Sequence, residues 1–468
     1  MLFIFVAVAA AELYERAPDV LPGTLPGMQN PSYWISRMDN PDELILPIDR
    51  IMAMNERYER KMSQSDPFKD VNPERKAILY PLNARKKPLE RPGRALSIPD
   101  IHKLPPHEIS NAIKETIQKQ ITYLRSIPFA NMYAIDYSPR EIDAFEHEMG
   151  LDIIPEKPAV VDAITVRHSR IRIVPSFYPQ QMGLKENKTI RAWDMWNLGT
   201  LRTGRPVSII HTSRTGAFLF VLSDEGYGWV NAEDVAFGNK NKINDFAEPA
   251  DFVVCTGDRV PYYTDKDCRY VSGWLRMGDR TPVAEKNNKR VIQVPLRKNN
   301  GRFEIEKAWL AEDADVTIGW LQYTRRNIIE TSFKLIDTPY DWTGAWMGRN
   351  HVTTYRDIFA CFGFRLPFQG ELFTHFGSNE EVVSPDMGKE KQNREILKHE
   401  PFVTIMVSWE HGQLLLGENN GMPIVFDQHG YDYDSEDGTL LSIKRCCVGD
   451  TRQPWYFYDN NVTFLTLK

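Results

Sequence analysis

Short runs of alternating apolar and polar residues fill the middle of the chain. Between residues 158 and 325 these runs are separated by Gly, Asn, Asp and Pro turns, and they read DAITVRHSRIRIVP, RPVSIIHTS, AFLFVLS, YGWVNAEDVAF and RVIQVPL. Alternation with a period of two is typical of strands with one buried face, and many short strands with regular turns indicate small antiparallel barrels. The pattern predicts two barrels, over residues 158–240 and 241–325.

The pattern changes at residue 326. RNIIETSFKLID predicts a helix, the loop TPYDWTGAWMGRN follows, and HVTTYRDIFACFGF predicts a second helix that stops at Gly363 and Pro367. Three short strands come after a polar loop, namely FVTIMVS, GQLLLG and MPIVFD, and the Asn420-Gly421 pair between the last two favours a hairpin. Helices followed by an antiparallel sheet predict an α+β domain over residues 326–468.

Residues 12–157 combine two predicted helices with a stretch rich in proline and charge. The first helix begins after Pro47 and carries Ile48, Ile51 and Met52 on its apolar face. NAIKETIQKQITYLRSI predicts the second helix, and PLNARKKPLERPGR between them is typical of an extended linker. We expect this region to clamp the later domains together instead of folding around a large core of its own.

The chain starts with the uncharged apolar segment MLFIFVAVAAA at residues 1–11. This segment is too short to span a bilayer, and its three final alanines are typical of the cleavage region of a secretory signal peptide. No basic residue precedes the apolar core, so a buried N-terminal strand or helix is the alternative. We expect a signal peptide over residues 1–11, a secreted or periplasmic protein, and no membrane span in the rest of the chain.

Composition narrows the classes of protein that remain. The 468 residues, 42% of them hydrophobic and 11% aromatic, fit a globular protein of several domains. The formal net charge of −6 provides no overall positive field, so nucleic acid is not an expected partner. Five cysteines without a C-x-x-C pair argue against a disulfide scaffold and a zinc ribbon. Cys255 and Cys268 could still form one disulfide in a secreted protein.

The order of these segments resembles the NlpC-type cell-wall peptidases, which are papain-like cysteine hydrolases that cut peptidoglycan stem peptides. The resemblance is to the branch with an N-terminal clamp and two SH3-like barrels, and it runs from PSYWISR through HSRIRIVPS, GYGWVNAEDVA and PYDWTGAW to the end of the chain. It implies a multidomain protein with two small all-β SH3-like barrels and a C-terminal α+β papain-like domain. The implied partners are peptidoglycan-derived peptides or another protein.

In that family the second helix of the catalytic domain begins with an Asp-Cys-Ser triplet, a few residues after a Tyr-x-Trp-Gly-Gly loop. A cysteine there lies at the positive end of the helix dipole, which stabilises the nucleophilic thiolate. Here the loop begins at Tyr340 and Trp342, and an ungapped count places the triplet on Asn350, His351 and Val352. The nucleophile position therefore holds His351, and the changes at Asn350 and Val352 remove a charge and a hydroxyl from the substrate-binding subsite.

The positions of the nucleophile's partners are better preserved. By resemblance, His411 in EHGQLLLG takes the place of the family's catalytic histidine, and Asp427 in IVFDQHG that of the residue that orients it. An imidazole and a carboxylate on neighbouring antiparallel strands can hydrogen-bond, which fixes the tautomer of the imidazole. Tyr340 and Trp342, with Trp346, could line the substrate groove or simply pack. His211 and Trp229 match barrel positions and are expected to be core and turn residues.

No cysteine occupies position 351. Cys361 lies ten residues further along the same predicted helix, where we expect a core residue, and Cys446 and Cys447 in KRCCVGD match no nucleophile context. The leading hypothesis is therefore a catalytically degenerate protein, a pseudoenzyme that binds peptide or cell-wall fragments or a protein partner and needs no cofactor.

Two alternatives stay open. The chain could be an active cell-wall peptide hydrolase that uses a non-standard nucleophile or a metal-bound water, and a zinc ion would then take His351, His411 and Asp427, with His429 as a further ligand. It could also be a structural or assembly protein whose barrels provide the interaction surface.

Overall fold

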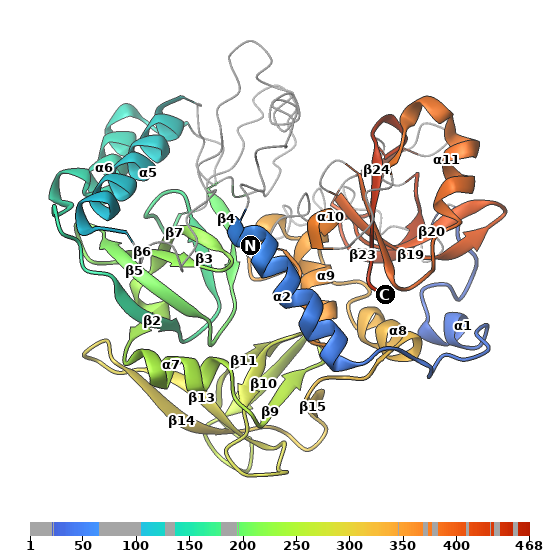
Figure 1. Cartoon of the computed structure of the whole chain (residues 1–468), viewed down its shortest axis with the longest axis horizontal. Helices are drawn as coiled ribbons and strands as arrows, with labels where there is room; N and C mark the ends of the chain where they lie inside the picture. The colour runs from blue at the N-terminus through green and yellow to red at the C-terminus, as the bar shows by residue number, and fades with distance from the viewer. Residues whose placement is uncertain are drawn as a thin grey trace, which may run out of the picture. The chain divides into compact units, whose positions relative to one another are not determined.

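The computed structural model divides the chain into two units. One, called here the C-terminal unit, comprises Met1–Met54, Leu321–Tyr340 and Gly348–Lys468, and the other, called the barrel unit, comprises Asn55–Trp320 and Asp341–Met347 (Figure 1). The structure describes residues 21, 23–64, 104–126, 136–178, 194, 196–344, 346–367, 373–376, 382–408, 411–430, 432–434, 440–452 and 457–468. The expected signal peptide and the linker PLNARKKPLERPGR lie outside these residues.

The first barrel is a seven-stranded antiparallel sheet in the order β4-β3-β7-β6-β5-β2-β8. Its strands are β2 (Val161–Thr165), β3 (Ser169–Arg172), β4 (Asn197–Leu201), β5 (Pro206–Thr212), β6 (Phe218–Ser223), β7 (Gly226–Asn231) and β8 (Val235–Phe237). All of them except β4 fall within or at the edges of the alternating runs of the sequence. The strands predicted for this part of the chain are therefore confirmed.

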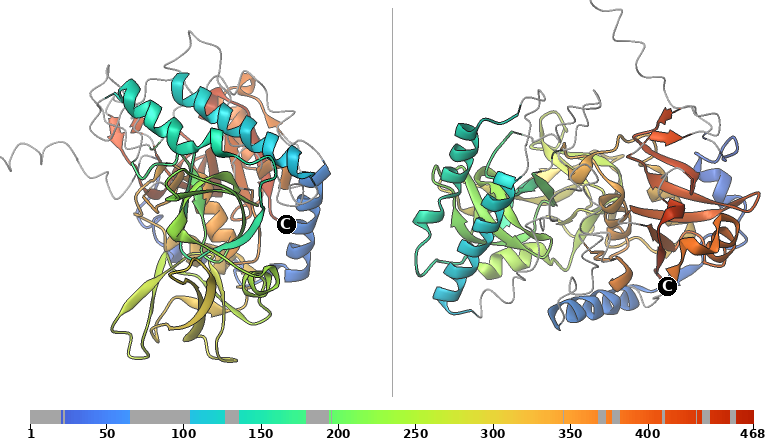
Figure 2. Two further views of the ribbon diagram at one scale, coloured as in Figure 1. Left: turned by 90° about the vertical axis from the view of Figure 1, so that its left-hand side faces the viewer. Right: turned by 90° about the horizontal axis from the view of Figure 1, so that it is seen from above.

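Two helices cover one face of the first barrel, as Figures 1 and 2 show. The helix α5 (Pro106–Ser126) confirms the second predicted helix, and α6 (Pro139–Met149) begins with a capping box between Ser138 and Glu141. Apolar side chains of α5 share one buried core with Trp229 of β7. The indole Nε1 of Trp229 donates to Oε1 of Gln120 at 3.0 Å, so Trp229 is the core residue that the sequence predicts.

The second barrel consists of two antiparallel sheets, in the orders β11-β10-β14-β13 and β12-β9-β15. Their strands are β9 (Phe252–Cys255), β10 (Arg259–Tyr263), β11 (Val271–Arg276), β12 (Arg280–Pro282), β13 (Val291–Arg297), β14 (Phe303–Trp309) and β15 (Val316–Ile318), and α7 (Lys240–Ala247) precedes them. Cys255 belongs to the buried core of this barrel. No disulfide joins it to Cys268, and all five cysteines of the chain lie in the described residues.

The C-terminal unit contains a six-stranded antiparallel sheet in the order β17-β24-β18-β19-β20-β23. The three predicted strands are present as β18 (Thr404–Ser408), β19 (His411–Asn419) and β20 (Met422–Gln428). Asn420 and Gly421 have φ angles of 52° and 75°, as the turn of a tight hairpin requires. The pattern did not indicate β17 (Val382–Val383), β23 (Cys446–Asp450) or β24 (Val462–Thr466), nor the separate pair β21 (Asp432–Asp434) and β22 (Leu440–Ser442).

The helices of this unit include the two that the sequence predicts, α8 (Arg325–Phe333) and α9 (His351–Ala360), and also α10 (Phe373–Phe376) and α11 (Lys389–Ile396). The helix α9 ends three residues before Gly363, which has a φ of 94° and closes the turn that follows. The first predicted helix of the chain is present as α2 (Ile48–Gln64), which spans the boundary between the two units.

The N-terminal residues of the C-terminal unit pack on its sheet and helices. Trp34 in α1 (Pro31–Ile35) makes an edge contact with Phe402, their ring centroids 6.1 Å apart. Gln29 exchanges two side-chain hydrogen bonds with the backbone of Val448 in β23. The strand β1 (Leu44–Leu46) pairs with β16 (Tyr323–Thr324). Long-range contacts of this kind explain why the first residues of the chain group with its end.

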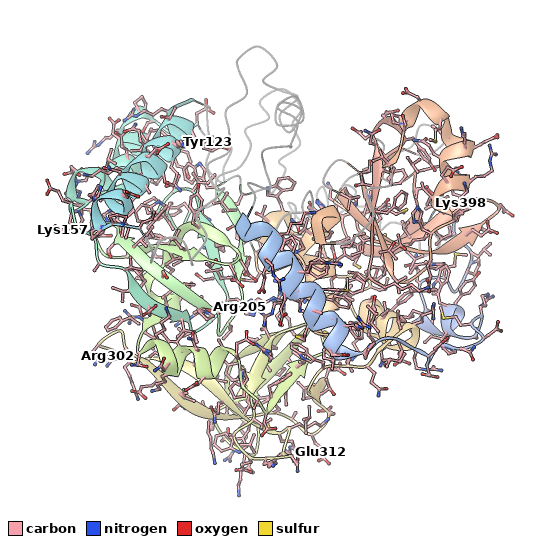
Figure 3. All side chains as sticks on the ribbon, in the orientation of Figure 1. Tyr123, Lys157, Arg205, Arg302, Glu312 and Lys398 are labelled. Carbon is pink, nitrogen blue, oxygen red and sulfur yellow. The ribbon has the colours of Figure 1, made fainter. Side chains whose placement is uncertain are left out.

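Charged side chains cover the surfaces of both units, as Lys157, Arg302, Glu312 and Lys398 illustrate in Figure 3. Within the part of the chain that the structure describes, no helix combines the length and the apolar character needed to cross a bilayer.

Candidate active site

The helix α9 starts at the position that the sequence analysis singles out. The side-chain Oδ1 of Asn350 accepts hydrogen bonds from the backbone N–H groups of Val352 and Thr353, at 3.1 and 2.9 Å. The backbone N–H of Asn350 in turn donates to Oγ1 of Thr353 at 2.9 Å, which completes a capping box. Asn350 therefore fixes where the helix begins, and its side-chain oxygen is committed to the helix backbone.

His351 is the first residue of α9 and is almost completely buried. Its ring lies against that of His411, with ring centroids 4.4 Å apart and planes inclined by 38°. On another side it stacks on Tyr340, with centroids 6.4 Å apart and planes inclined by 23°. Gly430 leaves room for this tyrosine, because a Cβ atom there would lie 2.5 Å from the Tyr340 ring. The ring of His351 therefore contacts a second imidazole and a phenol ring.

His411 opens β19, opposite Ser408 of β18, and is bonded to Asp427 near the end of β20. Its Nε2 donates to Oδ1 of Asp427 at 2.7 Å, which is the hydrogen bond that the sequence analysis expects. Because Nε2 carries the proton of this hydrogen bond, the lone pair of the neutral ring is on Nδ1. A base oriented in this way is able to take a proton from a neighbouring group.

Asp427 is completely buried and has several partners. Oδ2 accepts a hydrogen bond from Nε2 of Gln413 at 3.0 Å, and Nδ1 of His429 lies 3.5 Å from the same oxygen. Burial by itself would raise the pKa of Asp427, but the charge of His411 and the hydrogen bonds from His411 and His429 hold that pKa below its ordinary value. The carboxylate is therefore ionised at neutral pH and accepts the hydrogen bonds of His411 and Gln413.

Two further side chains hold the site together, those of Gln413 and Tyr355, and neither was predicted from the sequence. Gln413 lies two residues after His411 on the same strand, and this spacing could have indicated a side chain on the same face. Tyr355 of α9 donates its hydroxyl to the carbonyl of Phe426 at 2.7 Å and accepts from the N–H of Leu414 at 3.1 Å. One phenol therefore joins α9 to β19 and β20 beside the histidine pair.

The three cysteines of the C-terminal unit are buried. Cys361 is buried at the C-terminal end of α9, and this confirms that it is a core residue. Cys446 and Cys447 lie opposite Gln428 and Asp427 in the ladder between β20 and β23. Burial raises the pKa of both of these thiols, and the charge of Asp427 adds to the effect, so neither is a thiolate at neutral pH.

Zinc was the other route to hydrolysis that the sequence left open, through His351, His411, Asp427 and His429. Among the described residues, no group of three or more His, Cys, Asp and Glu side chains is arranged to hold a metal ion. The short contacts of Asp427 are those of a hydrogen-bonded carboxylate.

Trp342 and Trp346 belong to the barrel unit, through a loop that runs from Asp341 to Met347. This loop includes the single turn η4 (Trp342–Gly344) and two non-glycine residues with positive φ, Thr343 and Met347. Asn197 of β4 donates its Nδ2 to the carbonyl of Thr343 at 2.9 Å and holds the loop against the first barrel. The structure thus groups Tyr340 with the histidine pair and Trp342 with the barrels.

Comparison with known proteins agrees with this architecture. The model for the SH3 domain of the SH3b1 type matches residues 185–231, within the predicted first barrel. The structure is similar to that of an NlpC/P60 endopeptidase from Photobacterium damselae subsp. piscicida, with a TM-score of 0.69, 16% identity and coverage of 96% of each chain. A comparison with curated protein sequences gives no match.

Two further solved structures are less similar. An NlpC/P60 family protein from Bacillus cereus ATCC 10987 has a TM-score of 0.40 and 14% identity, and the match covers 64% of this chain and 98% of that one. NlpC2 from Trichomonas vaginalis has a TM-score of 0.25 and 11% identity, over 66% of this chain and 99% of that one. The fold assignment rests on the Photobacterium structure. Along almost its whole length the chain has the fold of that NlpC/P60 endopeptidase, with SH3-like barrels and a C-terminal papain-like domain.

Proposed function

We propose that the C-terminal unit binds peptides derived from peptidoglycan and does not cleave them as a cysteine peptidase would. The observation that carries this proposal is the ring of His351 at the start of α9, 4.4 Å from the ring of His411. A cysteine peptidase needs a thiolate at this point to form the acyl-enzyme. An imidazole supplies no sulfur, so the base His411 has no thiol to activate.

The neighbouring substitutions support binding with altered specificity. In the family that the chain resembles, an acid and a serine beside the nucleophile help to hold the free amino end of the substrate. Here Asn350 uses its side-chain oxygen to cap α9, and Val352 has no polar group. The subsite therefore lacks the negative charge that would pair with an ammonium group. We infer that a bound peptide is held by other contacts, among them the phenol ring of Tyr340.

Two further points belong to this proposal. The likeness in fold to an NlpC/P60 endopeptidase and the SH3b1-type domain favour a cell-wall peptide as the ligand.

Peptidoglycan lies outside the cytoplasmic membrane, so the proposal includes export, with residues 1–11 as the signal peptide. The amino-terminal sequence of the exported protein tests this last point.

The second candidate is an active hydrolase, and the intact pair of His411 and Asp427 favours it. A base whose tautomer is fixed by a buried carboxylate is able to activate a water molecule without any thiol. In that case hydrolysis depends on His411 and not on a cysteine. A metal-bound water, with His351, His411 and Asp427 as ligands, is a variant of the same candidate, and the zinc content of the purified protein tests it.

The test is a binding titration with purified muropeptides, followed by mass spectrometry of the same mixtures. We expect saturable binding, unchanged muropeptide masses, and affinity at least tenfold weaker in Tyr340→Ala. Lys398→Ala is the matched control, because this exposed lysine of the same unit lies outside the site, and it should bind as the wild type does.

Two results would overturn the proposal. Cleavage products that disappear in His411→Ala would establish the hydrolase instead. Absence of binding at millimolar muropeptide would favour a structural or assembly protein that acts through its barrels.

A further inference from the structure

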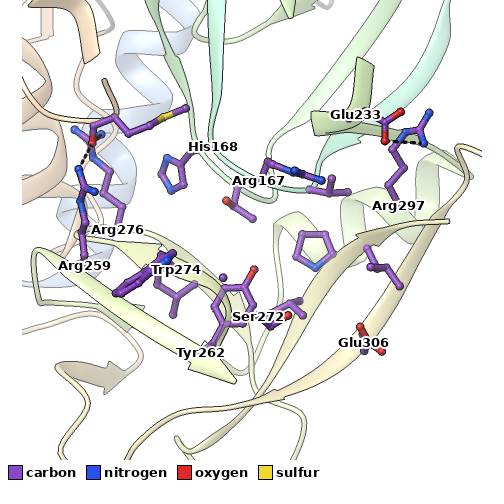
Figure 4. A pocket seen from close by; sticks show the side chains of 18 residues that line it. Arg167, His168, Glu233, Arg259, Tyr262, Ser272, Trp274, Arg276, Arg297 and Glu306 are labelled. Carbon is purple, nitrogen blue, oxygen red and sulfur yellow. Dashed lines mark hydrogen bonds and ion pairs between the residues drawn. The ribbon is translucent and has the colours of Figure 1, made fainter. Parts of the chain in front are cut away.

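The barrel unit contains a cavity of about 480 Å³ between its two barrels, and all of the residues that line it belong to this unit. The first barrel contributes Arg167, His168 and Glu233, and the second contributes side chains from β10, β11, β13 and β14. Figure 4 shows these groups around one space. The volume lies within the range of about 300–1,000 Å³ that is typical of small-molecule sites.

Polar contacts between the two barrels fix the shape of this cavity. Nε2 of His168, in the first barrel, is bonded to Oδ2 of the buried Asp279 in the second barrel at 2.7 Å. Nη1 of Arg202 donates to the carbonyl of Met277 at 2.9 Å and to Oδ1 of Asp279 at 3.3 Å. The cavity is therefore formed before a ligand enters it, which lowers the entropy cost of binding.

Trp274 provides a large flat surface in the cavity. It belongs to β11, an edge strand of its sheet, and it is 53% exposed, which is unusual for so large an apolar side chain. Ser272 lies two residues earlier on β11, so its hydroxyl is on the same face of the strand as the indole. The indole thus offers a ring face to the apolar side of a ligand, next to a group that forms hydrogen bonds.

Side chains of both charges line the cavity. Glu233 pairs with Arg297 at 3.5 Å, as the dashed line on the right of Figure 4 marks, and Glu306 of β14 also lines the space. Arg167 pairs with Asp234 at 3.3 Å. An anionic ligand meets the two glutamates and a cationic ligand meets the arginines, so part of the lining repels a net charge of either sign. This arrangement favours a neutral ligand.

The lining also offers both donors and acceptors of hydrogen bonds. Arg259 is exposed, and the carbonyl of Met347 takes one of the five N–H donors of its guanidinium, at 2.8 Å from Nη2. Carboxylate oxygens accept, and a hydroxyl does both. Three residues with hydroxyl groups line the space, Thr203, Tyr262 and Ser272. A ligand that carries many hydroxyl groups finds a partner for each of them here.

We propose that this cavity binds a neutral saccharide made of glucose-type rings. Such a ring carries its hydroxyl groups roughly in the plane of the ring and its axial C–H bonds above and below it. The apolar face of one ring stacks on the indole of Trp274, and the hydroxyl groups bond to the guanidinium of Arg259 and the carboxylates of Glu233 and Glu306. This proposal concerns the barrel unit alone and does not depend on the function proposed for the C-terminal unit.

The test is calorimetric titration of the full chain with three tetrasaccharides of β-linked rings. The first is made of N-acetylglucosamine and is neutral, the second is its deacetylated form with ammonium groups, and the third is made of glucuronic acid. We expect the neutral tetramer to bind at least fivefold more tightly than either charged one. The acid is the more stringent comparison, because arginines outnumber glutamates in the lining.

Variants connect the binding to Trp274. Trp274→Ala should weaken binding of the neutral tetramer at least tenfold, and Trp274→Phe should restore part of it, because a ring face remains. Tyr178→Ala is the matched control, since it removes an exposed aromatic side chain of the barrel unit outside the cavity lining, and it should bind as the wild type does. In fluorine NMR of the wild type labelled with 5-fluorotryptophan, the resonance that is missing in Trp274→Phe should shift when the tetramer is added.

Four results would overturn the proposal. The first two are absence of binding of the neutral tetramer at millimolar concentration, and a charged tetramer that binds as tightly as the neutral one. The third is an equal loss of affinity in Trp274→Ala and Tyr178→Ala. The fourth is equal affinity for the blocked peptide acetyl-tetraalanine amide, because the site would then recognise amide groups instead of sugar rings.

Discussion

At the scale of single residues, three polar side chains far apart in the sequence lie together at the start of α9 and on β19 and β20. The sequence predicts that His351, His411 and Asp427 lie together, and the structure brings them together with His429. The ungapped count from Trp342 located His351, and the resemblance of EHGQLLLG and IVFDQHG to family motifs located His411 and Asp427. Gln413 was missed, although it lies two residues after His411 and therefore on the same face of β19.

Asp427 makes the stability of the chain depend on pH. The charge of His411 and the bonds from His411 and His429 hold the pKa of Asp427 below its ordinary value, despite its burial. The ionised carboxylate therefore adds stability above the unfolded pKa of about 3.9, and this stability is lost as the pH falls below that value. At pH 7 we expect Asp427→Asn to cost about 3 kcal/mol, since it leaves the imidazoles without their carboxylate.

The measurement is urea unfolding of the wild type and of Asp427→Asn between pH 7 and pH 3. The difference between the two proteins should shrink steadily as the pH falls below 4. A difference that stays constant over this range would show that folding does not lower the pKa of Asp427.

The thiols provide a second test at this scale. Burial raises the pKa of Cys446 and Cys447, whereas Cys268 is partly exposed. Only the thiolate reacts with iodoacetamide, so we expect labelling of the native protein at pH 7.5 to begin at Cys268 and to reach the buried pair at least a hundredfold more slowly. Peptide mapping by mass spectrometry identifies the labelled sites. Rapid labelling of Cys447, opposite Asp427, would instead identify an unrecognised nucleophile.

At the scale of elements, local patterns predict most strands and helices, and long-range pairing accounts for what they miss. Alternating runs locate every strand of the first barrel except β4, and one of them locates β13 of the second barrel. The Asn420-Gly421 turn locates the β19–β20 hairpin. The strands β17, β23 and β24 are short, and they pair with segments far away in the sequence. Their register depends on those partners, so the pattern of a single segment does not reveal them.

The assignment of residues 350–352 can be tested by restoring the Asp-Cys-Ser triplet of the family at the start of α9. We expect the triple variant with His351→Cys, Asn350→Asp and Val352→Ser to fold, because Asp also caps a helix. Its new thiol lies at the positive end of the helix and beside His411, which should lower the thiol pKa.

Iodoacetamide should therefore label position 351 at least tenfold faster than Cys361 at pH 6.5. The variant with His351→Cys alone serves as the control, since it lacks the restored flanking residues. If a folded triple variant labels no faster at position 351 than at Cys361, the ungapped count that places the nucleophile at 351 is wrong.

At the scale of the whole molecule, the sequence predicts domains that follow one another along the chain. In the structure, two segments instead belong to a different unit from the residues next to them in the sequence. Residues up to Met54 group with the C-terminal unit, and the loop from Asp341 to Met347 groups with the barrels. Side-chain hydrogen bonds contribute to both groupings, from Gln29 to Val448 and from Asn197 to Thr343. Composition and periodicity carry no information on such bonds, because they depend on single atoms that meet only after folding.

The central claim is that a papain-like site with histidine in place of the nucleophile binds cell-wall peptides and leaves them intact. The most direct test is mass spectrometry of purified muropeptides after prolonged incubation with the wild-type chain at equimolar concentration. The account predicts unchanged muropeptide masses with the wild type and with His411→Ala alike. Products that accumulate with the wild type and are absent with His411→Ala would contradict it.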